Sequence, residues 1–192
     1  MSIEGQAPTP AEEPIEIECN VETSAKKNWS CCDLLQYCAK CDELDDQVRR
    51  KNFGERPENY DDVRADGNDA AATYRAGWNA AAANGTIAAA DQGAVQNMFY
   101  HECAYQQAQA NDFEIGPEMQ PDHVVEIQAG GSATNLGNLK WLSTSVNRSV
   151  QSVSGKIGRE YDSSKDQTVE VDCCPAEQGY CNGKTPSQPV LP

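Results

Sequence analysis

Four polar residues in the C-terminal half of the chain have the types and the spacing of a hydrolytic site. Asp122 and His123 are adjacent, Asn138 follows the histidine by fifteen positions, and Asn147 follows after nine more. An imidazole can act as a general base toward water, and carboxylate and amide oxygens can hold a hard cation. Hydrolysis of a phosphodiester needs such a base, together with a cation that neutralises charge on the phosphate and the leaving oxygen.

The segment that contains these residues, DHVVEIQAGGSATNLGNLKWLSTSVNRS, resembles the HNH, or ββα-metal, nucleases. The matching features are the DH pair at a strand, the Gly-Gly turn, the NL dipeptide before a short apolar strand, and a polar ligand one turn into the following helix. The resemblance covers roughly 40 residues, Asp122 to Tyr161, and implies a metal-dependent endonuclease. The segment is also similar to the nuclease tips of bacterial polymorphic toxins, which would imply delivery by a secretion system and a cognate immunity protein.

The resemblance implies a role for each residue. His123 would be the general base, and Asn138 would orient its imidazole through the nitrogen that faces away from the water. Asp122 and Asn147 would hold one divalent ion. Mg²⁺ is expected, with Mn²⁺, Ni²⁺ or Zn²⁺ as alternatives, because the last family position, often histidine, is here an amide oxygen ligand. Arg148 is the expected phosphate contact, and DNA, cut with little sequence preference, is the expected substrate.

The charge of the chain supports a rival hypothesis, a non-catalytic acidic interaction protein with a degenerate ββα unit. Thirty acidic and 15 basic side chains leave a formal charge of −15. A polyanion of this kind repels nucleic acid unless basic groups are locally concentrated. The segment from Asp122 to Tyr161 escapes the acidic bias, because it holds four bases and three acids.

The site needs a strand, a turn, a second strand and a helix to bring its side chains together. The branched residues of His123–Gln128 predict the first strand, and 129–132 predict a turn. Lys140–Leu142 predicts the second strand. Ser143 or Thr144 can then cap a helix that runs to about Gly158.

The rest of the chain is predicted to be mainly helical, so that the fold class is α+β. We expect a flexible acidic lead-in over 1–30, a Cys-containing helical region over 31–116, the HNH-like module over 117–165, and a Cys-containing tail over 166–192. The helical region should contain one helix or two short ones over 31–51, a loop over 52–68, a helix from Asp69 to about Asn84, and another from about Thr86 or Ala90 to Gln109. The tail contains one expected strand, TVEVDCC.

Nine cysteines cannot all pair within one chain. Disulfides between the N-terminal and C-terminal groups and buried thiols are equally compatible with the sequence. A zinc site is a third hypothesis, with Cys38 and Cys41 completed by His101 and Cys103. The longest apolar stretch, Ala80 to Ala90, is too short to cross a bilayer, and no secretory signal begins the chain. We therefore expect a cytoplasmic protein or one delivered by a specialised secretion system.

Overall fold

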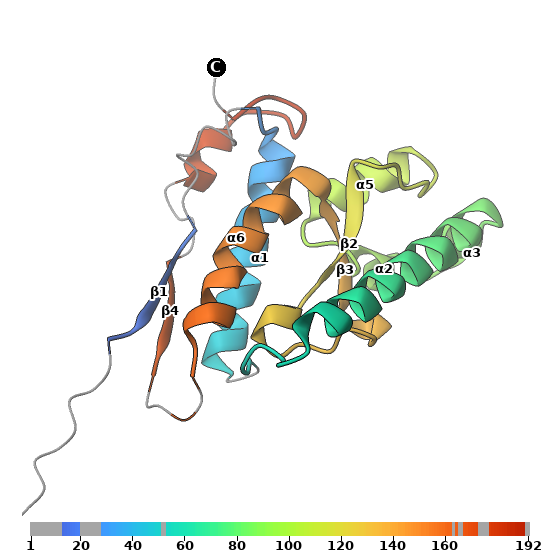
Figure 1. Cartoon of the computed structure of the whole chain (residues 1–192). Coiled ribbons are helices and arrows are strands. Elements are labelled where there is room, and N and C mark those ends of the chain that lie inside the picture. The colour runs from blue at the N-terminus through green and yellow to red at the C-terminus, as the bar shows by residue number, and fades with distance from the viewer. Residues whose placement is uncertain are drawn as a thin grey trace, which may run out of the picture.

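The computed structural model describes residues 13–19, 28–50, 53–162, 164, 167–172 and 177–190 of the 192-residue chain. These residues form helices and short strands, which confirms the coarse α+β expectation (Figure 1). The sheet of β1 (Ile15–Glu18) and β4 (Val169–Asp172) and the sheet of β2 (Met119–His123) and β3 (Leu139–Ser143) lie on opposite sides of a central pair of helices, α1 (Cys31–Arg49) and α6 (Thr144–Glu160). The long helix α2 (Tyr60–Ala83) crosses beside the sheet of β2 and β3.

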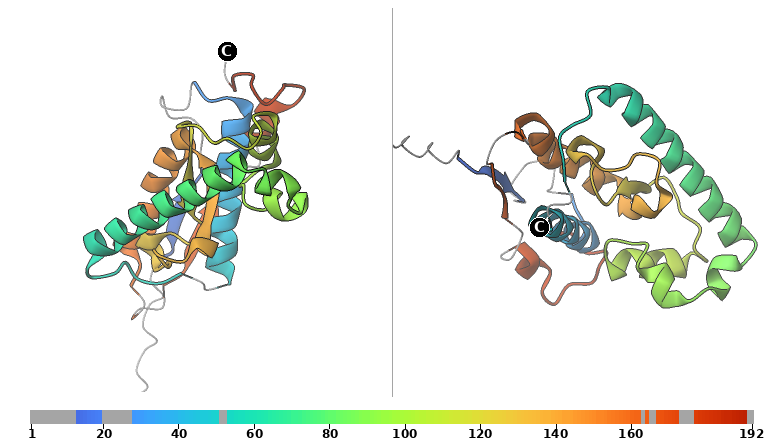
Figure 2. Two further views of the ribbon diagram at one scale, coloured as in Figure 1. Left: turned by 90° about the vertical axis from the view of Figure 1, so that its right-hand side faces the viewer. Right: turned by 90° about the horizontal axis from the view of Figure 1, so that it is seen from below.

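Helix α1 (Cys31–Arg49) lies at the centre of the described structure (Figure 2). It begins with a capping box, in which the backbone N–H of Asp33 donates to the Ser30 hydroxyl at 3.1 Å and the backbone N–H of Ser30 donates to the Asp33 carboxylate at 3.0 Å. Even its polar residues Gln36 and Lys40 are buried. The helix predicted over 31–51 is therefore confirmed, and it is a core helix.

Three disulfides tie α1 to the rest of the chain, and one sulfur of each belongs to α1. The bonded pairs are Cys19–Cys41, Cys31–Cys181 and Cys32–Cys103. Of the two interpretations that the sequence left open, disulfides are confirmed at these six positions. Among the described bonds, only Cys31–Cys181 joins the N-terminal and C-terminal groups as expected, and Cys173 and Cys174 lie outside the described residues. The zinc hypothesis is wrong, because Cys41 and Cys103 are oxidised and cannot be thiolate ligands.

Strands β2 (Met119–His123) and β3 (Leu139–Ser143) pair antiparallel, with His123 opposite Leu139 and Met119 opposite Ser143. Helix α6 (Thr144–Glu160) follows β3 directly and packs against α1 and both strands. The second strand and the helix that the sequence predicted are confirmed.

The first predicted strand is wrong, because β2 ends at His123 where that strand was expected to begin. The chain then forms a loop with 3₁₀ turns at Ile127–Ala129 (η2) and Leu136–Asn138 (η3). The Asn138 amide binds both backbone groups of Val125, accepting from its N–H at 2.9 Å and donating to its carbonyl at 3.0 Å. A side chain thus takes the hydrogen bonds that a strand neighbour would make.

Helix α2 (Tyr60–Ala83) begins earlier than the Asp69 that the sequence indicated, so the loop predicted over 52–68 is wrong in its second half. Gly67 was interpreted as a loop residue, but it lies inside the helix. A Cβ at Gly67 would lie 2.5 Å from Cδ1 of Ile127. This glycine therefore permits close packing and does not break the helix.

The single helix expected to end at Gln109 is divided into α3 (Thr86–Ala89), α4 (Gln92–Gln96) and α5 (Glu102–Ala110). The Asp91 carboxylate accepts from the N–H of Ala94 at 2.9 Å and caps α4. Nδ1 of His101 accepts from the N–H of Cys103 at 3.2 Å and caps α5. Each cap begins a new helix, which explains the interruption.

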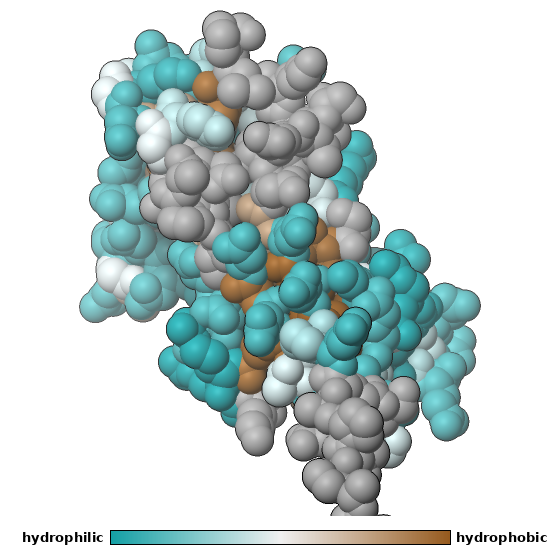
Figure 3. Space-filling view, turned by 90° about the vertical axis from the view of Figure 1, so that its left-hand side faces the viewer, coloured by the Kyte–Doolittle hydropathy of each residue, from teal (hydrophilic) through white to brown (hydrophobic). Residues whose placement is uncertain are grey.

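The second sheet is formed by β1 (Ile15–Glu18) and β4 (Val169–Asp172), which pair in parallel. Ile15 and Ile17 point into the core between exposed glutamates, and hydrophobic residues are visible among hydrophilic ones on this face of the molecule (Figure 3). The predicted lead-in over 1–30 thus contains a strand, while its residues 1–12 and 20–27 lie outside the described part. None of the helices in that part is long and apolar enough to span a bilayer.

Candidate active site

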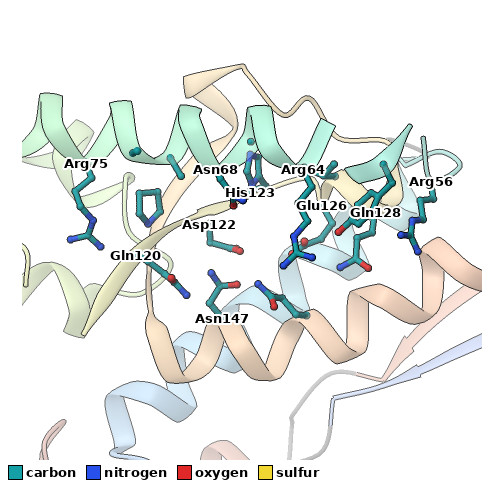
Figure 4. Close-up of a pocket in the computed structure, with 17 residues that line it drawn as sticks. Arg56, Arg64, Asn68, Arg75, Gln120, Asp122, His123, Glu126, Gln128 and Asn147 are labelled. Atoms are coloured by element: carbon teal, nitrogen blue, oxygen red, sulfur yellow. The ribbon is translucent and has the colours of Figure 1, made fainter. Parts of the chain in front are cut away.

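A polar pocket of about 560 Å³ lies between α2 and α6, beside the end of β2 (Figure 4). Asp122 and His123 reach it from the end of β2, and Asn147 reaches it from the first turn of α6. Three of the predicted site residues are therefore brought together. Amides and guanidinium groups make up much of the remaining lining, among them Arg56, Arg64, Arg75, Gln120, Gln128 and Gln151.

His123 is half-buried beneath α2. A Cβ at Gly67 would lie 3.3 Å from Cε1 of the imidazole, so the helix backbone approaches the ring directly. Nε2 of His123 lies 3.2 Å from the carbonyl oxygen of Ala133. A proton donated from Nε2 to this carbonyl leaves the lone pair on Nδ1. Burial lowers the pKa of His123 below 6.5, although the Ala133 hydrogen bond and Asp122 oppose this, so the ring is neutral at neutral pH and can accept a proton.

The ammonium group of Lys40 lies behind the pocket and is fully buried. Its Nζ lies 2.8 Å from Oδ2 of Asp122 and 2.9 Å from Oε1 of Glu126. It also donates to the Tyr100 hydroxyl at 3.0 Å and to the backbone carbonyl of His123 at 2.5 Å. The ammonium of Lys40 therefore fixes the positions of two carboxylates and of the backbone carbonyl of His123 relative to one another.

The charges of this cluster shift one another's pKa values. Burial alone lowers the pKa of Lys40, but the carboxylates of Asp122 and Glu126 raise it well above 10.5, so the ammonium stays charged. The pKa of Glu126 is raised to about 7, mainly by burial and also by the Asp122 charge, while Lys40 opposes both. One ammonium thus faces two carboxylates, and the second carboxylate is not fully ionised at neutral pH.

Asn147 is 7% exposed and lies opposite Asp122 across the pocket (Figure 4). The start of α6 that carries it is fixed to α1, because the N–H of Ser143 donates to Oε1 of Gln36 at 3.0 Å. The amide of Asn147 and the carboxylate of Asp122 therefore present oxygen donors to the same space from two fixed elements.

Two predicted site residues have other positions. The expected bond from Asn138 to the imidazole of His123 is replaced by the bonds to Val125 and by one to the Ser132 carbonyl at 3.0 Å, so Asn138 shapes the loop, and Ala133 contacts the ring instead. Arg148 is exposed on α6 and does not line the pocket.

Arg56 and Arg64 of the pocket lie in the stretch 52–68, where the sequence analysis placed a loop, whereas Arg75 lies in the helix that it predicted. Arg56, Tyr60, Arg64 and Asn68 follow one another at four-residue steps and all line the pocket. That spacing is the signal of one helix face and could have identified these residues. Lys40 carried no such signal, because nothing in its local sequence distinguishes it from a surface lysine.

The donor set of the pocket suits a magnesium ion and does not suit zinc. Within the residues that the structure describes, no group of three or more His, Cys, Asp or Glu side chains could hold a metal. A zinc site ordinarily needs at least three protein ligands. Mg²⁺ keeps several waters and is bound through one or two carboxylates together with substrate phosphates. Asp122 and Asn147 are sufficient in that mode, although Lys40 already pairs with one oxygen of Asp122.

The pocket therefore combines a neutral imidazole, a carboxylate opposite an amide, and cationic side chains on its rim. This set can activate water and bind a phosphate. A scan of the chain against protein-family models found no match, and searches of the curated proteins and of the solved structures found none either.

Proposed function

We propose that the protein is an HNH-type, metal-dependent endonuclease that hydrolyses phosphodiester bonds of DNA with little sequence preference. The observation that carries this proposal is the single pocket lined by Asp122, His123 and Asn147 together with Arg56 and Arg64. The order of β2, β3 and α6 supports it, because a strand end and the first turn of the following helix supply these groups.

In the proposed mechanism, the neutral imidazole of His123 takes a proton from the attacking water. Arg56 and Arg64 bind phosphate oxygens and orient the scissile bond. Asp122 and Asn147 would hold Mg²⁺, which when bound neutralises charge on the phosphate and the leaving oxygen. Lys40 fixes Asp122 and the carbonyl of His123, so both groups keep one orientation.

The two histidines of the chain provide a matched pair for the test. His123→Asn removes the proposed base, while His101→Asn changes the same residue type at the cap of α5, where asparagine is an equally suitable cap. Both variants and the unaltered protein are incubated in Mg²⁺, Mn²⁺, Ni²⁺ or Zn²⁺ with supercoiled plasmid, in which negative supercoiling opens short single-stranded stretches. We expect nicking in Mg²⁺ by the unaltered protein and by His101→Asn, and loss of nicking by His123→Asn.

Equal nicking by His123→Asn would contradict the proposed base. Nicking that continues unchanged in a metal chelator would contradict the proposed ion. Circular dichroism of each variant checks that it is folded.

The rival proposal, a non-catalytic interaction protein, is favoured by one observation. Lys40 already pairs with both Asp122 and Glu126, so the carboxylates of the pocket have a partner without any metal. This rival predicts no plasmid cleavage in any of the four ions. The same assay therefore separates the two functions.

The disulfides bear on where the protein acts. Disulfides form and persist in oxidising compartments and are rare in the cytosol. The three pairs described above therefore favour an exported protein over the cytoplasmic alternative. An antagonistic toxin with a cognate immunity protein agrees with export and remains part of the proposal.

A further inference from the structure

We infer that the pocket is part of a groove that takes one single strand of nucleic acid and excludes a duplex. This inference rests on the proposed function and specifies its substrate class. Four features of the molecule support it. One face of α2 lines the groove and the opposite face is acidic, His123 lies beneath the helix, and the guanidinium group of Arg56 lies over the ring of Tyr60.

One face of α2 lines the groove over most of its length. The lining positions run from Tyr60 through Arg64, Asn68 and Ala72 to Arg75. At 1.5 Å per residue, these positions span about 22 Å. Figure 4 shows Arg64 and Arg75 along this face, and Arg56 in the segment before the helix. A groove of this length follows a nucleic-acid backbone over more than one phosphate.

The arginines of the groove differ in whether their guanidinium groups are available to bind a phosphate. Arg75 donates to the carbonyls of Gly116 and Met119, so it holds the chain before β2. Arg64 is exposed at the middle of the groove, and Arg56 is exposed at one end. We therefore assign the phosphate contacts to Arg56 and Arg64.

The opposite face of α2 is acidic. Asp62, Asp66 and Asp69 are exposed there and do not line the pocket. A duplex carries one phosphate charge per roughly 1.7 Å of its axis, on two strands at a fixed separation. With one strand in the groove, the second strand would lie outside it, on a protein of formal charge −15 whose helix α2 carries exposed aspartates on the face away from the groove. The positive charge of Arg56 and Arg64 is therefore sufficient to bind the phosphates of one strand only.

The depth of His123 also favours a single strand. The imidazole lies beneath α2, against Gly67, and it is reached through a pocket of about 560 Å³. A duplex is too wide and too stiff to bring one of its phosphates under a helix.

Arg56 and Tyr60 form a stacking surface at one end of the groove. The guanidinium carbon of Arg56 lies 3.9 Å from the centroid of the Tyr60 ring. Unpaired bases stack on aromatic rings and on guanidinium planes, and this stacking tolerates any sequence. Bases within a duplex are already stacked and cannot use such a surface.

The test measures binding by His123→Asn in Mg²⁺, so that cleavage does not interfere. Three fluorescently labelled probes of one sequence are used, a DNA strand, an RNA strand and the DNA duplex, and fluorescence anisotropy is measured over a range of salt concentrations. We expect at least one of the single strands to bind more tightly than the duplex at every salt concentration. The two single-stranded probes show which polymer is preferred.

Two further variants, each made in the His123→Asn protein, separate charge from stacking. Arg64→Gln should weaken binding and reduce the slope of log Kd against log salt by roughly 0.7, the value for one phosphate contact with a single strand. Tyr60→Ala should weaken binding by roughly fivefold or more with little change in slope. Arg49→Gln is the matched control, because Arg49 pairs with Asp45 on α1 outside the pocket. The Arg49→Gln substitution should change neither the Kd nor the slope of log Kd against log salt.

A duplex that binds as tightly as both single strands would overturn the inference, and so would an Arg64→Gln protein that binds like the control. Neither result would contradict the proposed hydrolysis, which is tested by cleavage with the unaltered protein, although the second would remove Arg64 from the proposed mechanism. Conversely, preferential binding of a single strand without cleavage in any metal would contradict the proposed function and leave this inference standing.

Discussion

Lys40 is the residue on which the geometry of the candidate site most depends. Its ammonium is fully buried between the carboxylates of Asp122 and Glu126. Replacing one partner of a buried ion pair leaves the other charge without compensation, which costs roughly 3–5 kcal/mol. We expect Lys40→Met to lower the free energy of unfolding by that amount, measured by urea denaturation at neutral pH.

Lys140→Met is the matched control for this prediction. Lys140 is partly exposed and lies 3.8 Å from Glu43, so its loss should cost less than about 1 kcal/mol. Adding Asp122→Asn and Glu126→Gln to Lys40→Met should recover part of the lost stability, because both uncompensated charges are then removed. Equal costs for the two lysine variants would show that the buried cluster contributes little.

Glu126 should make stability depend on pH. Its pKa is about 7 in the folded protein because of burial, compared with 4.5 for the ordinary side chain. The folded state therefore holds this proton more tightly than the unfolded chain. The resulting stability is fully present below pH 4.5 and is lost as pH rises through about 7. At 1.36 kcal/mol for each pH unit, the loss is roughly 3 kcal/mol.

Urea denaturation from about pH 4 to about pH 8 measures this effect, with Glu126→Gln as the control. The glutamine variant cannot ionise at this position, so its stability should fall less over the same range. Parallel curves for the two proteins would contradict the shifted pKa of Glu126.

Among the elements, helix α2 contains two glycines whose replacement by alanine should affect stability differently. A Cβ at Gly77 would have no neighbour within 4 Å, so Gly77→Ala should stabilise the protein by about 0.5–1 kcal/mol through helix propensity. A Cβ at Gly67 would press on Ile127 and on the imidazole of His123. Gly67→Ala should therefore gain no stability and should slow plasmid nicking. Thermal denaturation and the nicking assay test both variants, and equal behaviour would contradict the packing role of Gly67.

The elements that the sequence predicted well are those whose periodicity reflects burial by local neighbours. The buried face of α1, the strand at Lys140–Leu142 and the helix after Ser143 belong to this group. The first turns of α2 were missed because Gly67, which usually indicates a loop, is there for a contact with a residue 60 positions away. Such long-range packing leaves no local pattern.

The candidate site was predictable in part for the same reason. Asp122, His123 and Asn147 lie within one segment, and their spacing already indicated a common pocket. Lys40 comes from a helix more than 80 positions earlier in the chain, so only the tertiary fold reveals its role. Asn138 was assigned to the imidazole, but its amide instead satisfies the backbone of the loop, a role that sequence spacing alone does not distinguish.

At the scale of the whole molecule, the cross-links should contribute much of the stability, because each of the two described sheets has only two strands. The Cys31–Cys181 bond joins residues 150 positions apart. In the chain-entropy description, a disulfide that closes a long loop stabilises by about 3–5 kcal/mol. We expect Cys31→Ser with Cys181→Ser to lower the free energy of unfolding by that amount, measured by urea denaturation. A smaller loss should follow for the Cys19–Cys41 pair, which spans only 22 positions.

Every described disulfide has one sulfur in α1, and α1 also carries the ammonium that fixes the candidate site. Disulfide bonding and the position of the candidate site therefore depend on the same helix. While these cysteines are reduced, the chain lacks the cross-links that secure the helix, and with them a constraint on the position of the Lys40 ammonium.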